Sequence, residues 1–172
     1  AVGLWEGAYR SGAGLVDVDD AILATTSISP GKLALGEGEA GPHEVSLSVT
    51  NSGDGPVTYQ ISNDNGTVAA GPPSNNPGFF FDPATMSAPA EVTVGAGETR
   101  VVDLTIVPPD SSQRLYSGWV TFTPTSGGDP LRVPYAGISG DYQSIEVLTP
   151  GGFDGLELPV LGQLTDCDRL IG

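Results

Sequence analysis

Residues 45–61 read Val-Ser-Leu-Ser-Val-Thr-Asn-Ser-Gly-Asp-Gly-Pro-Val-Thr-Tyr-Gln-Ile, and this stretch decides the fold. Apolar and hydroxyl side chains alternate over residues 45–50, and apolar and polar side chains alternate again over 57–61. This period of two is the pattern of a β-strand. The intervening Asn-Ser-Gly-Asp-Gly-Pro is typical of a turn. We therefore predict an antiparallel pair of strands with one buried and one solvated face.

The same alternation recurs along the chain between residues 27 and 140. Further strands are expected at 32–35, 92–94, 102–106, 119–123 and 131–135, with Pro134 indicating an edge or a bulge. About seven short strands in such a length predict an all-β fold, a fibronectin type III or immunoglobulin-like antiparallel sandwich. The Cys…Trp…Cys signature of immunoglobulin domains is absent, which favours the fibronectin type III-like form.

A short N-terminal helix is expected before the strands. Asp17 is a suitable N-cap for a helix over residues 18–24, in which Val18, Ala21 and Ile22 share one face. The chain around this helix is too short to bury that face. Another part of a larger protein is expected to cover it.

The stretch from Asn63 to Pro89 does not follow the strand pattern. We interpret it as a long excursion that begins with a turn at 63–66 and carries the run Phe79, Phe80 and Phe81. Packing of these rings against the core is the favoured interpretation, since adjacent exposed Phe side chains are costly. The alternative is a partner-binding surface, and these three residues are the candidate interaction surface of the chain.

Composition excludes several classes of partner. The 172 residues carry a net charge of -15 with 6 Lys and Arg, which argues against nucleic acid and anionic membranes as partners. No apolar run reaches membrane-spanning length, so membrane insertion is not expected. Cys167 is the single cysteine, and it is either a free thiol or paired with a cysteine outside this chain.

No catalytic, cofactor or metal ligand set is assigned from the sequence. Asp17 or Asp19, His43 and Ser87 follow the chain order of a subtilisin-like triad, but the residues around them do not match such motifs, and order alone is weak evidence. Oxygen-rich segments are compatible with a structural calcium ion, but the sequence does not identify its ligands. Trp119 lies in an expected strand and is interpreted as covering a sheet face, with carbohydrate stacking as the alternative.

Two segments resemble large secreted subtilisin-like serine proteases. Residues 12–21, Gly-Ala-Gly-Leu-Val-Asp-Val-Asp-Asp-Ala, resemble the stretch that opens the last helix of the catalytic domain. Residues 116–122, Tyr-Ser-Gly-Trp-Val-Thr-Phe, and 131–142, Leu-Arg-Val-Pro-Tyr-Ala-Gly-Ile-Ser-Gly-Asp-Tyr, are similar to the end of the fibronectin type III-like domain of cell-envelope proteinases. Residues 93–99, Thr-Val-Gly-Ala-Gly-Glu-Thr, match a strand and turn of the same domain.

The resemblance implies a division of the chain and a role for it. Residues 1–26 would be the end of a catalytic domain, 27–140 the fibronectin type III-like sandwich, and 141–172 a tail or the start of a further domain. The chain would be a non-catalytic accessory module, secreted or on the cell surface, that braces or spaces the catalytic domain of its parent serine endopeptidase. Its partners would be that catalytic domain and a protein substrate. The alternative function is a free-standing adhesion or carbohydrate-binding sandwich.

Overall fold

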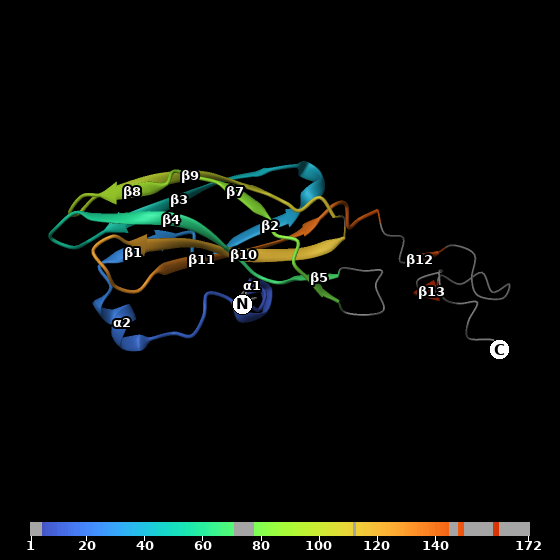
Figure 1. Ribbon diagram of the computed structural model, residues 1–172, viewed down its shortest axis with the longest axis horizontal. Coiled ribbons are helices and arrows are strands. Elements are labelled where there is room, and N and C mark those ends of the chain that lie inside the picture. The colour runs from blue at the N-terminus through green and yellow to red at the C-terminus, as the bar shows by residue number, and fades with distance from the viewer. Residues whose placement is uncertain (1–4, 71–77, 112, 145–147, 150–159, 162–172) are drawn as a thin grey trace.

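The computed structural model describes residues 5–70, 78–111, 113–144, 148–149 and 160–161. Two β-sheets lie face to face and form a sandwich, with two short helices beside one sheet (Figure 1). The all-β sandwich predicted from the alternating strands is confirmed. No helix in these ranges has the length and apolar character needed to cross a membrane.

The first sheet has four strands in the order β1-β3-β9-β7. All its neighbours are antiparallel, and the longest pairing joins β3 to β9 from His43↔Ile106 to Thr50↔Thr99. The strands are β1 (Thr26–Ser29), β3 (His43–Asn51), β7 (Thr85–Ser87) and β9 (Thr99–Val107).

The second sheet has the order β2-β11-β10-β4-β8, and β5 and β6 extend it beside one end of β10. Its strands are β2 (Leu33–Glu37), β4 (Val57–Asn65), β5 (Val68–Ala70), β6 (Phe79–Phe80), β8 (Glu91–Val94), β10 (Arg114–Pro124) and β11 (Leu131–Ser139). Strand β2 runs parallel to β11, so the expectation of a wholly antiparallel sandwich is wrong at this edge.

The pairing of β2 with β11 explains how a proline is accommodated in the second sheet. Pro134 opposes Trp119 of β10, but β11 pairs with β2 only from Tyr135 onward, so no described strand pairs with that side of β11 at Pro134. The register also shifts between Ala136 and Gly137. The one-sided pairing and the register shift both fit the edge or bulge predicted from Pro134, because proline cannot donate a ladder hydrogen bond.

The core lies between the sheets and consists of the apolar half of each alternating strand. Within it, Tyr59 and Phe122 pack edge to face, with ring centroids 6.3 Å apart. The fully enclosed apolar side chains around them include Leu47, Val49, Ile106, Val94, Val120 and Tyr116.

The predicted pairing of residues 45–50 with 57–61 is wrong, because the chain changes sheets at this turn. Strand β3 belongs to the first sheet and β4 to the second. The buried Asn51 side chain supports the crossing: its amide donates to the carbonyl oxygens of Gly55 (2.8 Å), Val94 and Gly95 (both 3.2 Å). Its Oδ1 accepts from the Gly53 N–H (2.9 Å). One side chain thus satisfies main-chain groups of two turns that connect the sheets.

Strands β10 and β11 interlock through two tyrosines and two glycines. Tyr116 opposes Gly137, and Tyr135 opposes Gly118. A Cβ atom on either glycine would lie 2.5 Å from the hydroxyl oxygen of the tyrosine opposite it, so each ring occupies the space above a glycine. The Tyr135 hydroxyl also lies 2.8 Å from Asn63 Oδ1. This packing explains the Tyr-x-Gly and Tyr-x-Gly spacing of the two strands.

The region 63–89 is more regular than its composition suggested. Strand β4 continues to Asn65, so the expected turn at 63–66 is wrong, and β5, β6 and β7 follow within the excursion. The oxygen-rich side chains there have structural partners, since Asn63 donates to the Ala84 carbonyl oxygen (3.1 Å). In the C-terminal tail the structure describes only a short pair, β12 (Leu148–Thr149) with β13 (Val160–Leu161), and Cys167 lies outside the described residues.

Candidate interaction surfaces

The N-terminal segment 5–14, called the strap from here on, is fastened to the outer face of the second sheet. It contains α1 (Ala8–Ser11), whose first N–H donates to the Ser117 Oγ of β10 (2.9 Å, buried). The Trp5 carbonyl oxygen accepts from the Thr67 N–H (2.9 Å), and the Gly12 carbonyl oxygen accepts from the Trp119 indole (2.8 Å). Trp119 is buried beneath it, as expected of a residue that covers a sheet face.

Helix α2 (Val18–Leu23) follows the strap and matches the predicted helix within one residue. Asp17 caps it, and its carboxylate accepts from the N–H groups of Asp19 (3.1 Å) and Asp20 (3.3 Å). The next anchor after the helix is Thr25, whose carbonyl oxygen accepts from the Ser52 N–H (2.7 Å). The hydrogen bonds to the sandwich that lie nearest the helix are therefore at Gly12, six residues before it, and at Thr25, two residues after it.

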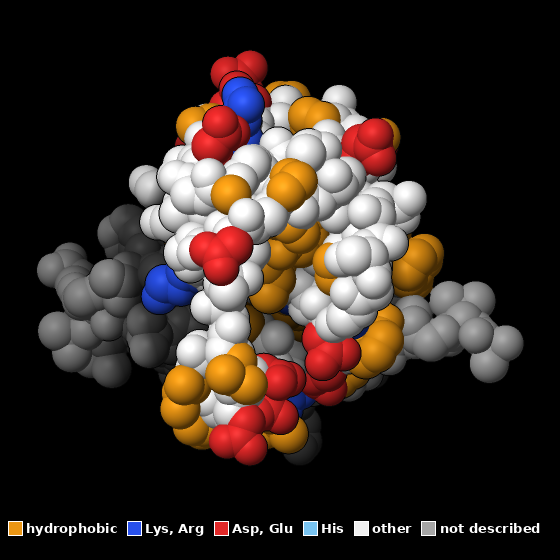
Figure 2. All heavy atoms as spheres, turned by 90° about the vertical axis from the view of Figure 1, so that its left-hand side faces the viewer, with side chains coloured by type: hydrophobic (Ala, Val, Ile, Leu, Met, Phe, Trp, Pro, Cys, Tyr) orange, Lys and Arg blue, Asp and Glu red, His pale blue; other side chains and the backbone are white. Residues whose placement is uncertain are grey.

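The apolar side chains of α2 and the residues before it remain exposed. Leu15 is fully exposed, and Ile22 and Leu23 are each 76 % exposed. Val16 and Val18 are exposed as well. Figure 2 shows the end of the molecule near α2, where apolar and acidic side chains intermingle over the lower part of the view. Neighbouring exposed aliphatic side chains of this kind are characteristic of an interface.

A second apolar surface lies at the other end of the second sheet. Phe79, Phe80 and Phe81 are 56 %, 44 % and 61 % exposed, so their expected packing in the core is wrong. Strand β6 pairs with β5, which brings the Arg114 guanidinium to 4.4 Å from the centre of the Phe80 ring. This cation–π contact covers one face of one ring and leaves the other two rings in solvent.

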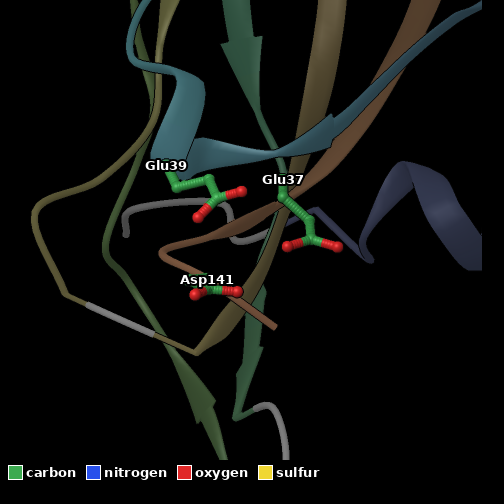
Figure 3. A group of neighbouring side chains, drawn as sticks. All are labelled: Glu37, Glu39 and Asp141. Atoms are coloured by element: carbon green, nitrogen blue, oxygen red, sulfur yellow. The ribbon is translucent and has the colours of Figure 1, made fainter. Parts of the chain in front are cut away.

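Three carboxylates converge near the end of β11. Glu37 ends β2, Glu39 lies in the 3-10 helix η1 (Gly38–Ala40) and Asp141 follows β11 (Figure 3). One oxygen from each lies within 4.8 Å of the others, a donor set that a hard cation such as Ca²⁺ accepts. One oxygen of Glu37 already accepts from the Tyr142 N–H (3.0 Å). The sequence did not single out these residues, because Asp141 lies more than 100 positions after the two glutamates.

The residues with triad-like chain order lie apart. His43 begins β3 and Ser87 ends β7, on opposite sides of β9. Two intervening strand spacings separate such positions by roughly 10 Å. Asp17 caps α2 near the opposite end of the sandwich (Figure 1). Burial lowers the pKa of His43, an effect that does not require a catalytic partner.

Residues 33–136 match the family model of the Fn3-like domain. The chain belongs to the Fn3-like domain family. Over 156 residues this Fn3-like chain is 30 % identical to a PI-type proteinase of Lactococcus lactis subsp. cremoris, covering 81 % of the chain and 8 % of the proteinase. A PII-type proteinase of Lacticaseibacillus paracasei is 29 % identical with the same coverage. The resemblance to cell-envelope proteinases is thereby confirmed.

Among solved structures, the ASH/PapD-like domain 7 of human CEP192 matches with a TM-score of 0.51 and 18 % identity, covering 68 % of this chain and 86 % of that domain. At this identity the match shows a shared sandwich fold and no shared function. The similarity to the proteinases spans only 8 % of their length, so the Fn3-like domain corresponds to a small piece of each.

Sequence reasoning missed the strap. Nothing in residues 5–14 has strand or helix periodicity, and the strap is fixed mainly by backbone groups that meet side chains more than 100 residues away. The signal that was present is Trp119, since an indole on the outer face of a strand requires a cover and a hydrogen-bond acceptor.

Proposed function

We propose that this Fn3-like domain is a non-catalytic accessory module of a secreted or surface-attached subtilisin-like serine endopeptidase. It docks against the catalytic domain of the same parent protein and holds that domain at a fixed position. The observation that carries the proposal is the exposed apolar surface of α2, whose flanking chain is fastened to the sandwich at Gly12 and at Thr25.

The choice of the catalytic domain as the partner rests on two observations. The chain is similar to a short piece of proteins named proteinases, so most of such a parent lies outside it. Residues 12–21, which lead into α2, resemble the last helix region of subtilisin-like catalytic domains. A helix that belongs to the edge of one domain and is fastened to the next would join the two domains rigidly.

Hydrogen exchange tests this docking. Amide exchange is measured for the 172-residue chain and for the parent proteinase that contains it. We expect the α2 amides to exchange much more slowly in the parent, while those of β10 are protected in both. Equal exchange of α2 in the two proteins would show that no partner covers the helix.

Substitution in the parent gives a second test. Ile22→Asp places a charge in the proposed interface and is expected to lower the temperature at which proteolytic activity is lost. Val101→Asp is the matched control, since Val101 is also exposed (61 %) but lies on β9 of the other sheet. An equal effect of both substitutions, or none from Ile22→Asp, argues against the α2 interface.

A further contact, with protein substrate, is proposed for the Phe79–Phe81 surface. Three consecutive exposed rings favour binding of an apolar segment, and β6 at the end of the sheet presents them together. The test compares the parent with its Phe79→Ala/Phe81→Ala variant on casein and on a short chromogenic peptide. A loss confined to casein supports the contact, and unchanged kcat/KM on both substrates refutes it.

A further inference from the structure

A small cavity lies between the strap and the outer face of the second sheet. Three neighbouring strands present one side chain each toward it: Asp64 from β4, Trp119 from β10 and Arg132 from β11. The strap lines the other side with Trp5, Glu6, Ser11, Ala13 and Gly14. The cavity measures about 210 Å³. At ~30 Å³ per water molecule it holds roughly seven waters, space enough for one six-membered sugar ring.

The groups lining this cavity are held in place before any ligand arrives. The Thr121 hydroxyl donates to Asp64 Oδ2 (2.6 Å), which orients the carboxylate. The Trp119 indole is fixed by its bond to the Gly12 carbonyl oxygen (2.8 Å). The Arg132 guanidinium lies 5.6 Å from the centre of the Trp5 ring, a cation–π distance. Such preorganisation lowers the entropic cost of binding.

The chemistry of the lining selects the class of ligand. The Trp5 indole provides an apolar surface for a flat ring face, and the charged groups and Ser11 offer hydrogen bonds at its edge. The charged groups are of both signs, with Asp64 and Glu6 as hydrogen-bond acceptors and Arg132 as a donor. Such a rim can hydrogen-bond to the hydroxyl groups of a neutral ring, which both donate and accept.

We infer that this cavity binds a neutral pyranose unit of a glycan. Trp5, 57 % exposed, is the accessible stacking surface, whereas Trp119, only 8 % exposed, forms the floor. This differs from the carbohydrate stacking considered for Trp119 on the sequence, because the strap covers the face of that indole. The inference does not depend on docking to a catalytic domain.

Ligand-observed NMR tests the inference. The 172-residue chain is titrated with neutral oligosaccharides built from glucose, galactose and N-acetylglucosamine, and with glucuronate as a charged comparison. We expect saturable binding of at least one neutral probe, with a dissociation constant of about 1 mM or tighter. Absence of saturable binding for every neutral probe, or tighter binding of glucuronate, overturns the inference.

Variants locate the binding. Trp5→Ala is expected to weaken the affinity about tenfold or more, and Trp5→Phe, which keeps an aromatic ring, should restore part of it. Arg132→Ala should also weaken binding. Because Arg132 makes none of the described hydrogen bonds of the strap, this variant distinguishes loss of a cavity contact from detachment of the strap. Tyr142→Ala is the control, an exposed aromatic side chain outside the cavity. Unchanged affinity in Trp5→Ala and Arg132→Ala, or equal loss in Tyr142→Ala, refutes this location.

Discussion

Gly118→Ala tests the interlock of β10 and β11 directly. The added Cβ would lie 2.5 Å from the Tyr135 hydroxyl oxygen and 2.6 Å from the Asp64 carbonyl oxygen. Ordinary contacts with carbon lie at about 3.5–4.0 Å, so one side must move by roughly 1 Å. The Asp64 carbonyl belongs to the paired strand β4, and the Tyr135 hydroxyl is held between Asn63 and Asn65.

The expected cost follows from these contacts. Overpacking of a well-filled core costs about 1–3 kcal/mol, and displacing the Tyr135 hydroxyl from its acceptors costs about 0.5–1.5 kcal/mol more. Removing a glycine from the unfolded chain returns about 0.4–1 kcal/mol. Gly118→Ala should therefore lower the free energy of unfolding by about 0.5–4 kcal/mol, measured by urea denaturation with tryptophan fluorescence.

Two further variants make this measurement decisive. Gly55→Ala is the control, because nothing lies within 4 Å of a Cβ there, and it should leave stability unchanged or slightly raised. In a Tyr135→Phe background the ring can tilt away from residue 118, so Gly118→Ala should cost less there than in the wild type. A Gly118→Ala change within about 0.5 kcal/mol of wild type would refute the interlock, since surface substitutions have effects of that size.

Three other predictions concern buried polar groups. Tyr116→Phe should be neutral or stabilising in urea denaturation, because the buried Tyr116 hydroxyl has no hydrogen-bond partner among the described residues; a loss above about 1 kcal/mol would indicate a partner. Asn51→Ala should cost about 2–4 kcal/mol, because it leaves several turn carbonyls unsatisfied, and a loss below about 0.5 kcal/mol contradicts this. Burial raises the pKa of Tyr116 from 10.0 to about 12, so the unfolded state loses this proton first. The contribution of this group to the free energy of unfolding should be constant below pH 10 and fall as the pH rises toward 12. The free energy of unfolding should therefore fall less steeply with pH in Tyr116→Phe than in the wild type. Equal slopes in the two proteins would exclude Tyr116 as the cause.

The alternating pattern predicted which side chains are buried but not which strands pair. Leu47, Val49, Val120 and Phe122 all lie in the core, as their period of two requires. The same pattern is satisfied whether β3 pairs with β4 or lies in the opposite sheet. Asn51 supports the observed arrangement through bonds to the carbonyl oxygens of Val94 and Gly95, which are remote in sequence. The residues of the turn alone therefore could not reveal which arrangement forms.

For the two candidate surfaces too, the sequence predicts what depends on local residues and does not predict what depends on remote ones. The helix over residues 18–23 was predictable, because its cap and apolar spacing are local, and so was the expectation that its face lacks a cover. The exposure of Phe79–Phe81 was not, since hydrophobicity favours burial wherever the fold offers room. Whether the fold offers such room depends on how β5 and β6 extend the sheet past Arg114.

The position of α2 depends on the strap more than on its own contacts. None of its residues is buried, so the helix gains little from packing on this domain. Its location is set by the hydrogen bond from Trp119 to Gly12 on one side and by the bond from Ser52 to Thr25 on the other. The two anchors keep the exposed aliphatic side chains near this end of the sandwich, which lowers the entropy lost when a partner covers them. A flexible tether would need neither the strap nor the buried indole, so the two anchors favour docking at this end of the sandwich over simple spacing.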